Sequence, residues 1–180
     1  ASVHTDFDRF AREGDVAGLR RLLTVEGFDP NSQQHNKDGA CVLQMACQNG
    51  QLECVKLLLE HKANPGLPNT NNTTAVWRAA GNGEKEILKL LLEYGKTYGE
   101  DSPDKLTSQA KVKDGKTPAY VSILNGETDC LQLLITEGAD VTTPGGASKP
   151  NERKTPLALA QERRDGRSAA LIALALNKKL

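Results

Sequence analysis

Leu133 to Thr142 read LLITEGADVT, and three altered copies of this stretch stand earlier in the chain. The copies read LLTVEGFDPN from Leu22, LLLEHKANPG from Leu57 and LLLEYGKTYG from Leu90. A unit of this size cannot bury its own apolar face, so it is stable only when it stacks on its neighbours. The repetition therefore predicts an elongated solenoid with a long exposed surface, which favours recognition over catalysis.

A glycine recurs four residues after an alanine-type position in each unit and gives the period of the array. The distance from Gly14 to Gly50 is 36 residues, from Gly50 to Gly83 it is 33, and from Gly83 to Gly126 it is 43. A basal period of about 33 residues with insertions is typical of ankyrin arrays and close to that of tetratricopeptide arrays.

The residues before the alanine-type position decide between these two families. Residues 117–122 read TPAYVS and residues 155–160 read TPLALA, which resemble the ankyrin signature TPLHxA, and substituted copies begin at Cys41 and Thr74. A tetratricopeptide array would lack the Thr-Pro start. On this resemblance, which covers nearly the whole chain, the protein is identified as a member of the ankyrin-repeat family. The resemblance implies an all-α fold, a solenoid of about five helix-turn-helix units joined by β-hairpin loops.

The physical chemistry of one unit agrees with that fold. The Thr117 hydroxyl can cap a helix N-terminus, and Pro118 then stands at the first helical position, where its missing N–H costs nothing. Gly126 can supply the left-handed turn that ends this short helix. Apolar spacing over 128–137 predicts a second helix, which Gly138 ends.

The units predicted from these landmarks form a single domain over 1–180. They are an N-terminal capping repeat (1–34), repeats over 35–67, 68–110 and 111–148, and a C-terminal capping repeat (149–180). The third repeat contains about ten extra residues, and residues 94–109 are polar with Gly and Pro breakers, so we expect an exposed loop there. Such a loop either grips a partner or is a tolerated insertion.

Composition excludes several classes of function. The chain of 180 residues has 23 basic and 23 acidic side chains, so no chain-wide field attracts DNA or RNA, and 4% aromatic residues do not make a base-stacking platform. It contains no run of 18 apolar residues and no apolar signal-peptide core at its start. We therefore expect an intracellular protein, cytoplasmic rather than nuclear, monomeric by itself, without a membrane span or nucleic-acid partner.

The cysteines and histidines do not form a recognisable chemical site. The four cysteines are Cys41, Cys47, Cys54 and Cys130, and three of them fall in one repeat, which raises a metal cluster as one interpretation. However, none forms a C-x-x-C pair and all occupy apolar or signature positions, which favours packing. The histidines are scattered, and no phosphate loop is present. The sequence predicts no catalytic residue, no metal and no cofactor.

The resemblance also implies where the protein binds. In ankyrin arrays the hairpin tips and the exposed side of the first helices form a concave surface. Carried over position by position, this gives Lys37, Asp38, Gln48, Asn49, Thr70, Asn71, Trp77, Arg78, Asn82, Lys113, Asp114, Lys116, Tyr120, Leu124, Asn125, Lys154 and Arg163. Trp77 and Tyr120 replace the family's usual His, and two roles are open for them: interface anchors, or packing between repeats.

The leading hypothesis is a non-catalytic protein-protein interaction module, with an adaptor, targeting or inhibitory role, that binds another protein or peptide through the concave face. One alternative is a substrate-selecting or regulatory region of a larger enzyme. Another is a contact to an anionic partner through the last repeat, because residues 149–167 hold six basic and three acidic side chains.

Overall fold

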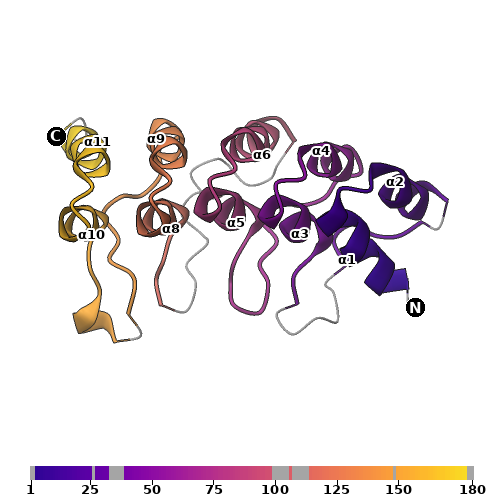
Figure 1. Cartoon of the computed structure of the whole chain (residues 1–180), viewed down its shortest axis with the longest axis horizontal. Helices are drawn as coiled ribbons and strands as arrows, with labels where there is room; N and C mark the ends of the chain where they lie inside the picture. Colours follow the sequence, from indigo (N-terminus) through magenta and orange to yellow (C-terminus); the bar gives the residue numbers. More distant parts are fainter. Residues whose placement is uncertain are drawn as a thin grey trace.

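Short helices follow one another in pairs in the computed structural model, which describes residues 3–25, 27–32, 39–98, 106, 114–147 and 149–177. The first helix of each pair lies in one row and the second helix in another, and the loop that precedes α5 projects beyond the first row (Figure 1). In chain order the helices are α1 (Val3–Glu13), α2 (Val16–Thr24), α3 (Val42–Gln48), α4 (Leu52–Glu60), α5 (Ala75–Gly81), α6 (Lys85–Tyr98), α8 (Pro118–Asn125), α9 (Thr128–Thr136), α10 (Pro156–Glu162) and α11 (Gly166–Asn177). A 3-10 turn spans Pro150–Glu152.

The two rows pack differently along the array. Helices α1, α3, α5, α8 and α10, which we call the inner row, contact their neighbours more closely than α2, α4, α6, α9 and α11, the outer row (Figure 1). Buried small residues such as Ala46, Ala79, Ala80 and Ala119 allow this close approach, because side-chain size sets the distance between packed helices. The array therefore curves with the inner row on its concave side, which confirms the predicted all-α solenoid.

Local signals begin and end the helices as the sequence predicts. The hydroxyl oxygens of Thr74, Thr117 and Thr155 accept hydrogen bonds from backbone N–H groups three residues later, at 3.2 Å each. Gly126 ends α8 in the left-handed conformation with φ 83°. The equivalent position of the last pair is Arg164, which adopts φ 57° without being a glycine. In these units, a capping threonine thus begins the shorter helix and a residue in the left-handed conformation ends it.

One buried position recurs in every helix pair and makes the core continuous. It lies eight residues after the turn residue between the two helices and is occupied by Leu22, Leu58, Leu91, Leu134 and Ile172, each at most 3% exposed. All five side chains belong to one cluster of buried apolar residues to which every helix pair contributes. No pair could form such a cluster alone, which is why the units depend on stacking.

The expected loop over 94–109 is wrong at its start, because α6 continues to Tyr98. The Thr97 hydroxyl donates to the Glu93 carbonyl at 3.1 Å, and Lys96 Nζ lies 2.5 Å from Glu137 Oε2 of the next pair. These contacts hold the extra turn despite Gly95. Leu106 is also helical and only 3% exposed, whereas the sequence predicted an exposed segment. The rest of the predicted loop lies outside the described residues.

Where the structure describes them, the loops before α5 and α10 turn back like hairpins with very little strand pairing. Backbone hydrogen bonds join Asn69 N to Thr73 O and Asn72 N to Asn69 O, both at 2.9 Å, and form a tight turn at 70–72. A single antiparallel bridge pairs Gly145 with Lys154 within the part of the chain that the structure describes. None of the described helices has the length and apolar character needed to cross a bilayer.

Candidate binding surface

Most of the residues expected to bind a partner line the concave side or the loops beside it. We call the solvent-facing side of the inner row, together with its loop tips, the inner face. Its exposed members are Gln48, Asn49, Thr70, Asn71, Asn82, Asn125, Lys154 and Arg163, and its half-buried members are Trp77, Arg78, Asp114, Lys116 and Leu124. Tyr120 is buried, and Lys37, Asp38 and Lys113 lie outside the described residues.

Three asparagines occupy the same position in successive repeats, just beyond the last turn of an inner helix or at its end. The amide nitrogens of Asn49 and Asn82 donate to carbonyls of their own helices, Met45 O at 2.9 Å and Arg78 O at 3.0 Å. Asn125 instead donates across to Gly81 O of the preceding repeat at 2.5 Å. These bonds fix each side chain at the surface, so the inner face presents three amides in set orientations.

Trp77 ties one repeat to the next, as the packing interpretation expected. Its indole Nε1–H donates to Lys116 O at 3.1 Å, 39 residues along the chain. Gln44 occupies the same position one repeat earlier, and its Nε2 donates to Thr73 O at 3.0 Å. Both acceptors directly precede the capping threonine of the next repeat. Gln44 was not predicted as a site residue, although its place in the signature marks it.

Tyr120 occupies the same position as Gln44 and Trp77 in the following repeat, but its side chain offers little surface to a partner. Its side chain is 3% exposed and its hydroxyl lies beside Gly146 of the following loop. Burial raises the pKa of the hydroxyl, which Lys116 and Lys154 only partly offset, so the group stays protonated at neutral pH. This placement favours packing over an anchor role for Tyr120.

Carboxylates neutralise much of the positive charge at the C-terminal end. Lys154 Nζ lies 2.6 Å from Glu162 Oε2, and Arg167 Nη2 lies 3.1 Å from Asp129 Oδ1. Lys149 pairs with Glu152 at 3.5 Å. Pairing of this kind lowers the attraction that the excess of basic residues would exert on an anionic partner.

A polar hollow of about 410 Å³ opens on the inner face where α1, α3 and α5 end. Arg12, Met45, Gln48, Asn49 and Arg78 line it. Arg78 Nη1 donates to Gln48 Oε1 across the repeat boundary, which holds the guanidinium in the hollow. Arg12 was not predicted, because the first repeat lacks the signature that located the other positions.

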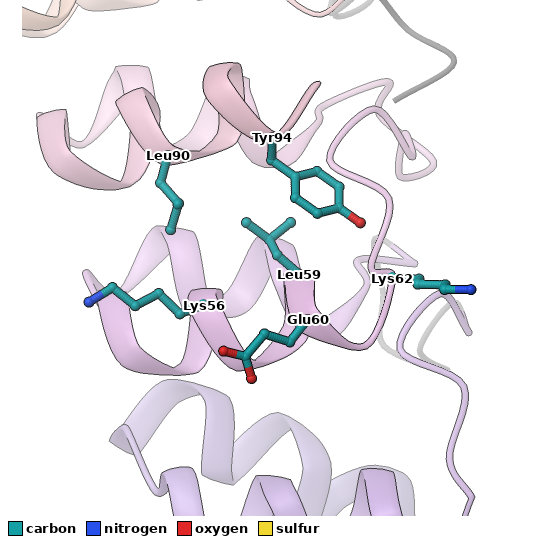
Figure 2. A pocket seen from close by; sticks show the side chains of 6 residues that line it. All are labelled: Lys56, Leu59, Glu60, Lys62, Leu90 and Tyr94. Carbon is teal, nitrogen blue, oxygen red and sulfur yellow. The ribbon is translucent and has the colours of Figure 1, made fainter. Parts of the chain in front are cut away.

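A second hollow, which we call the outer groove, lies between α4 and α6 on the opposite side of the array. It measures about 480 Å³, and Leu90 and Tyr94 of α6 point toward Leu59 of α4, while charged side chains stand around them (Figure 2). Lys56, Glu60 and Lys62 are those charged residues. Because both positive and negative side chains line the groove, its charge does not indicate one kind of ligand. The sequence did not predict this groove.

The four cysteines are buried, and burial raises the pKa of each thiol, that of Cys130 to about 11. Such thiols stay protonated at neutral pH and are poor nucleophiles and metal ligands. Within the described ranges, no three His, Cys, Asp or Glu side chains come together to hold a metal ion. The cysteines therefore act as small apolar core residues.

Stacked helix pairs with a polar concave face define a repeat solenoid, a class of protein built to present surface. The family model for ankyrin repeats (3 copies) matches residues 9–102, and the chain belongs to the ankyrin-repeat family. Ankyrin repeats are non-catalytic modules that bind other proteins.

Two of the relatives are ubiquitin ligases of plants. The chain is 26% identical over 140 residues to the E3 ubiquitin-protein ligase KEG of Arabidopsis thaliana, a match that covers 73% of this chain and 8% of that protein. It is 30% identical over 114 residues to the probable E3 ubiquitin-protein ligase XBOS32 of Oryza sativa subsp. japonica, covering 62% of this chain and 20% of that protein. The chain thus spans a fifth or less of the length of these relatives.

Proposed function

We propose that this chain binds a partner protein through its inner face, as an adaptor, targeting or inhibitory module. The observation that supports this best is the set of Asn49, Asn82 and Asn125, whose amides repeat at one position and are each held by a backbone carbonyl. Oriented amides can read the backbone of an extended segment at little cost in side-chain entropy. The remaining predicted contacts, including Thr70, Asn71 and Leu124, extend the same face.

The relatives favour a second, more specific role. Both are named as E3 ubiquitin-protein ligases, and each match covers only part of the relative. We propose that this chain's repeats select the substrate of such an enzyme, while catalysis lies in other sequence. The buried free thiols suit a reducing compartment, so we place the module in the cytoplasm, as a monomer.

Site-specific photocrosslinking tests which face binds. Benzoylphenylalanine replaces Gln48, Asn71 or Lys154 on the inner face in the full chain, and Lys56, Lys89 or Gln132 on the outer row as matched controls. We expect ultraviolet light to join the three inner-face variants to one and the same polypeptide, identified by mass spectrometry, and the outer-row variants to none.

Two results would contradict the proposal. Crosslinks from the outer-row positions alone would move the site to the opposite side of the array. An absence of crosslinks from every position, in the cells that produce the protein, would count against a partner on either side. For the more specific role, the captured polypeptide should carry ubiquitin when the ligase is active.

A further inference from the structure

The row of asparagines on the inner face continues to a cation in the last helix pair. The backbone N–H groups of Asn49, Asn82 and Arg163 donate to carbonyls four residues earlier, at 3.2, 3.1 and 3.0 Å. Each of these residues, like Asn125, directly precedes the left-handed residue between the two helices of its pair. Arg163 therefore occupies the position that an asparagine occupies in the three preceding pairs, and its side chain is exposed as theirs are.

Positive charge remains at this end of the row after the local ion pair is formed. The carboxylate of Glu162 is taken by Lys154, at 2.6 Å. Within the described ranges, neither Arg163 nor Arg164 forms an ion pair. Asp165 interacts electrostatically with Arg163, but its carboxylate also accepts a hydrogen bond from a backbone N–H of α11 at 3.0 Å. Two adjacent guanidinium groups thus have one further carboxylate beside them, and that carboxylate already binds α11.

The earlier positions of the row have a different charge. The carboxylates of Glu84 and Glu127 lie against the turn glycines of the second and third pairs, directly after the asparagines of those pairs. In the first pair the equivalent residue is Glu13, which is exposed, and Arg12 beside it offsets its charge. Carboxylates thus stand at or beside the first three positions, and a guanidinium stands at the last. An acidic group that lies on the row is therefore favoured at its α10 end.

We propose that Arg163 binds the carboxylate of an Asp or Glu side chain of the partner, and so fixes the direction in which an extended segment lies along the row. A guanidinium offers paired N–H donors that match the two oxygens of a carboxylate, and such charge-assisted bonds are stronger than neutral ones. Arg163 is exposed, so its donors are accessible, and Arg164 adds positive charge next to it. The proposal rests on partner binding by the inner face and adds the chemistry and the place of one contact.

Peptide selection on the whole chain tests this contact. The probe is a phage-displayed library of random dodecapeptides, selected on the wild type, on Arg163→Gln and on Arg20→Gln. The last variant removes one exposed arginine of the outer row, so it has the same net charge as Arg163→Gln and is the matched control. Thermal unfolding must agree among the three proteins, so that a loss of binding is not a loss of fold.

We expect the wild type and Arg20→Gln to enrich peptides with Asp or Glu at one fixed position, and Arg163→Gln to lose this preference. With the best peptide, changing its acid to the amide should weaken binding by about tenfold in the wild type. The same change should matter little in Arg163→Gln, because the two changes remove one interaction. Arg163→Lys should restore part of the affinity, since an ammonium group keeps the charge but lacks the paired donors.

A benzophenone group on the synthetic peptide tests the direction of the segment. Placed next to the acid, it should be joined by ultraviolet light to residues around α10. Placed at the far end of the same peptide, it should be joined to residues around α3 or α5. Mass spectrometry of the crosslinked chain locates both attachment points.

Each other outcome separates this inference from the proposed function. Enriched peptides without a preferred acid that crosslink to the inner face would keep that face as the binding site and reject the contact with Arg163. An equal effect of the acid-to-amide change in the wild type and Arg163→Gln would do the same, as would crosslinks from the acidic end to the polar hollow at Arg12 and Arg78. If only a phosphoserine version of the peptide bound, the position would select phosphate and not a carboxylate. No enrichment by the wild type, or crosslinks to the outer row alone, would contradict both proposals.

Discussion

The inner and outer rows of helices solve the same stacking problem with different interactions. In the inner row, small side chains bring helices close together, and side chains donate to backbone carbonyls across the boundary between the α5 and α8 repeats, from Trp77 Nε1 to Lys116 O and from Ser122 Oγ to Ala80 O at 3.2 Å. In the outer row, leucines fill a wider space and exposed ion pairs such as Arg167 with Asp129 span the surface.

This difference shows that the geometry of the inner side of the array is more strongly constrained than that of the outer side. Backbone-directed hydrogen bonds and close helix contacts define the geometry of the inner face, whereas exposed ion pairs contribute little to stability. The outer groove between α4 and α6 shows that the outer row also packs less completely. The side chains proposed to bind a partner are therefore positioned by the more closely packed row, and substitutions in the two rows should have different consequences.

The largest loss of stability is expected when a buried leucine of the outer row is truncated. Leu58→Ala removes a fully buried side chain of α4 and should destabilise the protein by about 2–5 kcal/mol, the sum of lost burial and the remaining cavity. Unfolding should also lose cooperativity between the two halves of the array, because each unit depends on its neighbours. Urea titration measures both. A change below about 1 kcal/mol would contradict the central place given to this leucine.

Enlarging a buried side chain should destabilise the packing of the inner row. Ala80→Leu adds volume to a position of α5 that is 0% exposed and should cost about 1–3 kcal/mol through displaced neighbours. Ala158→Leu on α10, where the side chain is exposed, is the matched control and should change stability little. Equal urea midpoints for Ala80→Leu and the wild type would show that close approach of the inner helices is not required.

Removal of one inner-row hydrogen bond should have an intermediate effect. Trp77→Phe keeps an aromatic ring but removes the donor to Lys116 O, and should destabilise the protein by about 1 kcal/mol. Calorimetry should show a lower Tm with no change in helix content. If Tm is unchanged while Ser122→Ala lowers it, the crossing bonds are not equivalent and the indole serves another purpose.

The loop that returns the chain from the outer to the inner row predicts a pH effect. Burial opposes ionisation of Asp140, but hydrogen bonds from Thr143 and Thr142 outweigh it and lower the pKa of the carboxyl to about 2. A lowered pKa contributes stability that is present above the unfolded value of 3.8 and is lost as pH falls toward 2. The loss should be about 1 kcal/mol or less, because the group is partly solvated.

Asp140→Asn is the control for this pH effect. Urea titrations at several pH values should show a smaller fall in stability for this variant between pH 4 and pH 2 than for the wild type. Parallel curves for the two proteins would mean that the carboxylate bonds do not favour the folded state.

The smallest loss of stability is expected when an exposed ion pair of the outer row is broken. Lys96→Gln breaks the ion pair between Lys96 and Glu137, which are 47% and 19% exposed, and should cost less than about 0.5 kcal/mol. A loss as large as that of Trp77→Phe would remove the distinction between the rows. Repeating the comparison in 1 M salt should abolish whatever difference exists, since salt screens exposed charges.

Features within a single unit could be predicted from the sequence, whereas contacts between units could not, apart from the packing of Trp77 between repeats. Thr117 and Gly126 act on residues a few positions away, so their roles in α8 are visible in the local pattern. The Asn125 bond to Gly81 O joins residues 44 positions apart and has no local mark. Likewise, the helical extension to Tyr98 depends on Glu137 of the next repeat, while the local glycine suggested a break.

The same limit applies to the candidate site. Gln48 and Asn82 were found because the signature gives their position, and Arg12 was missed because its repeat has lost that signature. Counting back from Gly14 as from Gly50 would have placed Arg12 level with Gln48. The predicted boundaries of the five units remain predictions.

The alanines buried between inner helices have a consequence for partner choice. They set the distance from each helix to the next, and with it the interval between the exposed amides of Asn49, Asn82 and Asn125. In the binding mode that we propose, a partner would match that interval along its own backbone. Two related arrays with identical surface residues could thus prefer different partners because of a methyl group that no partner ever touches.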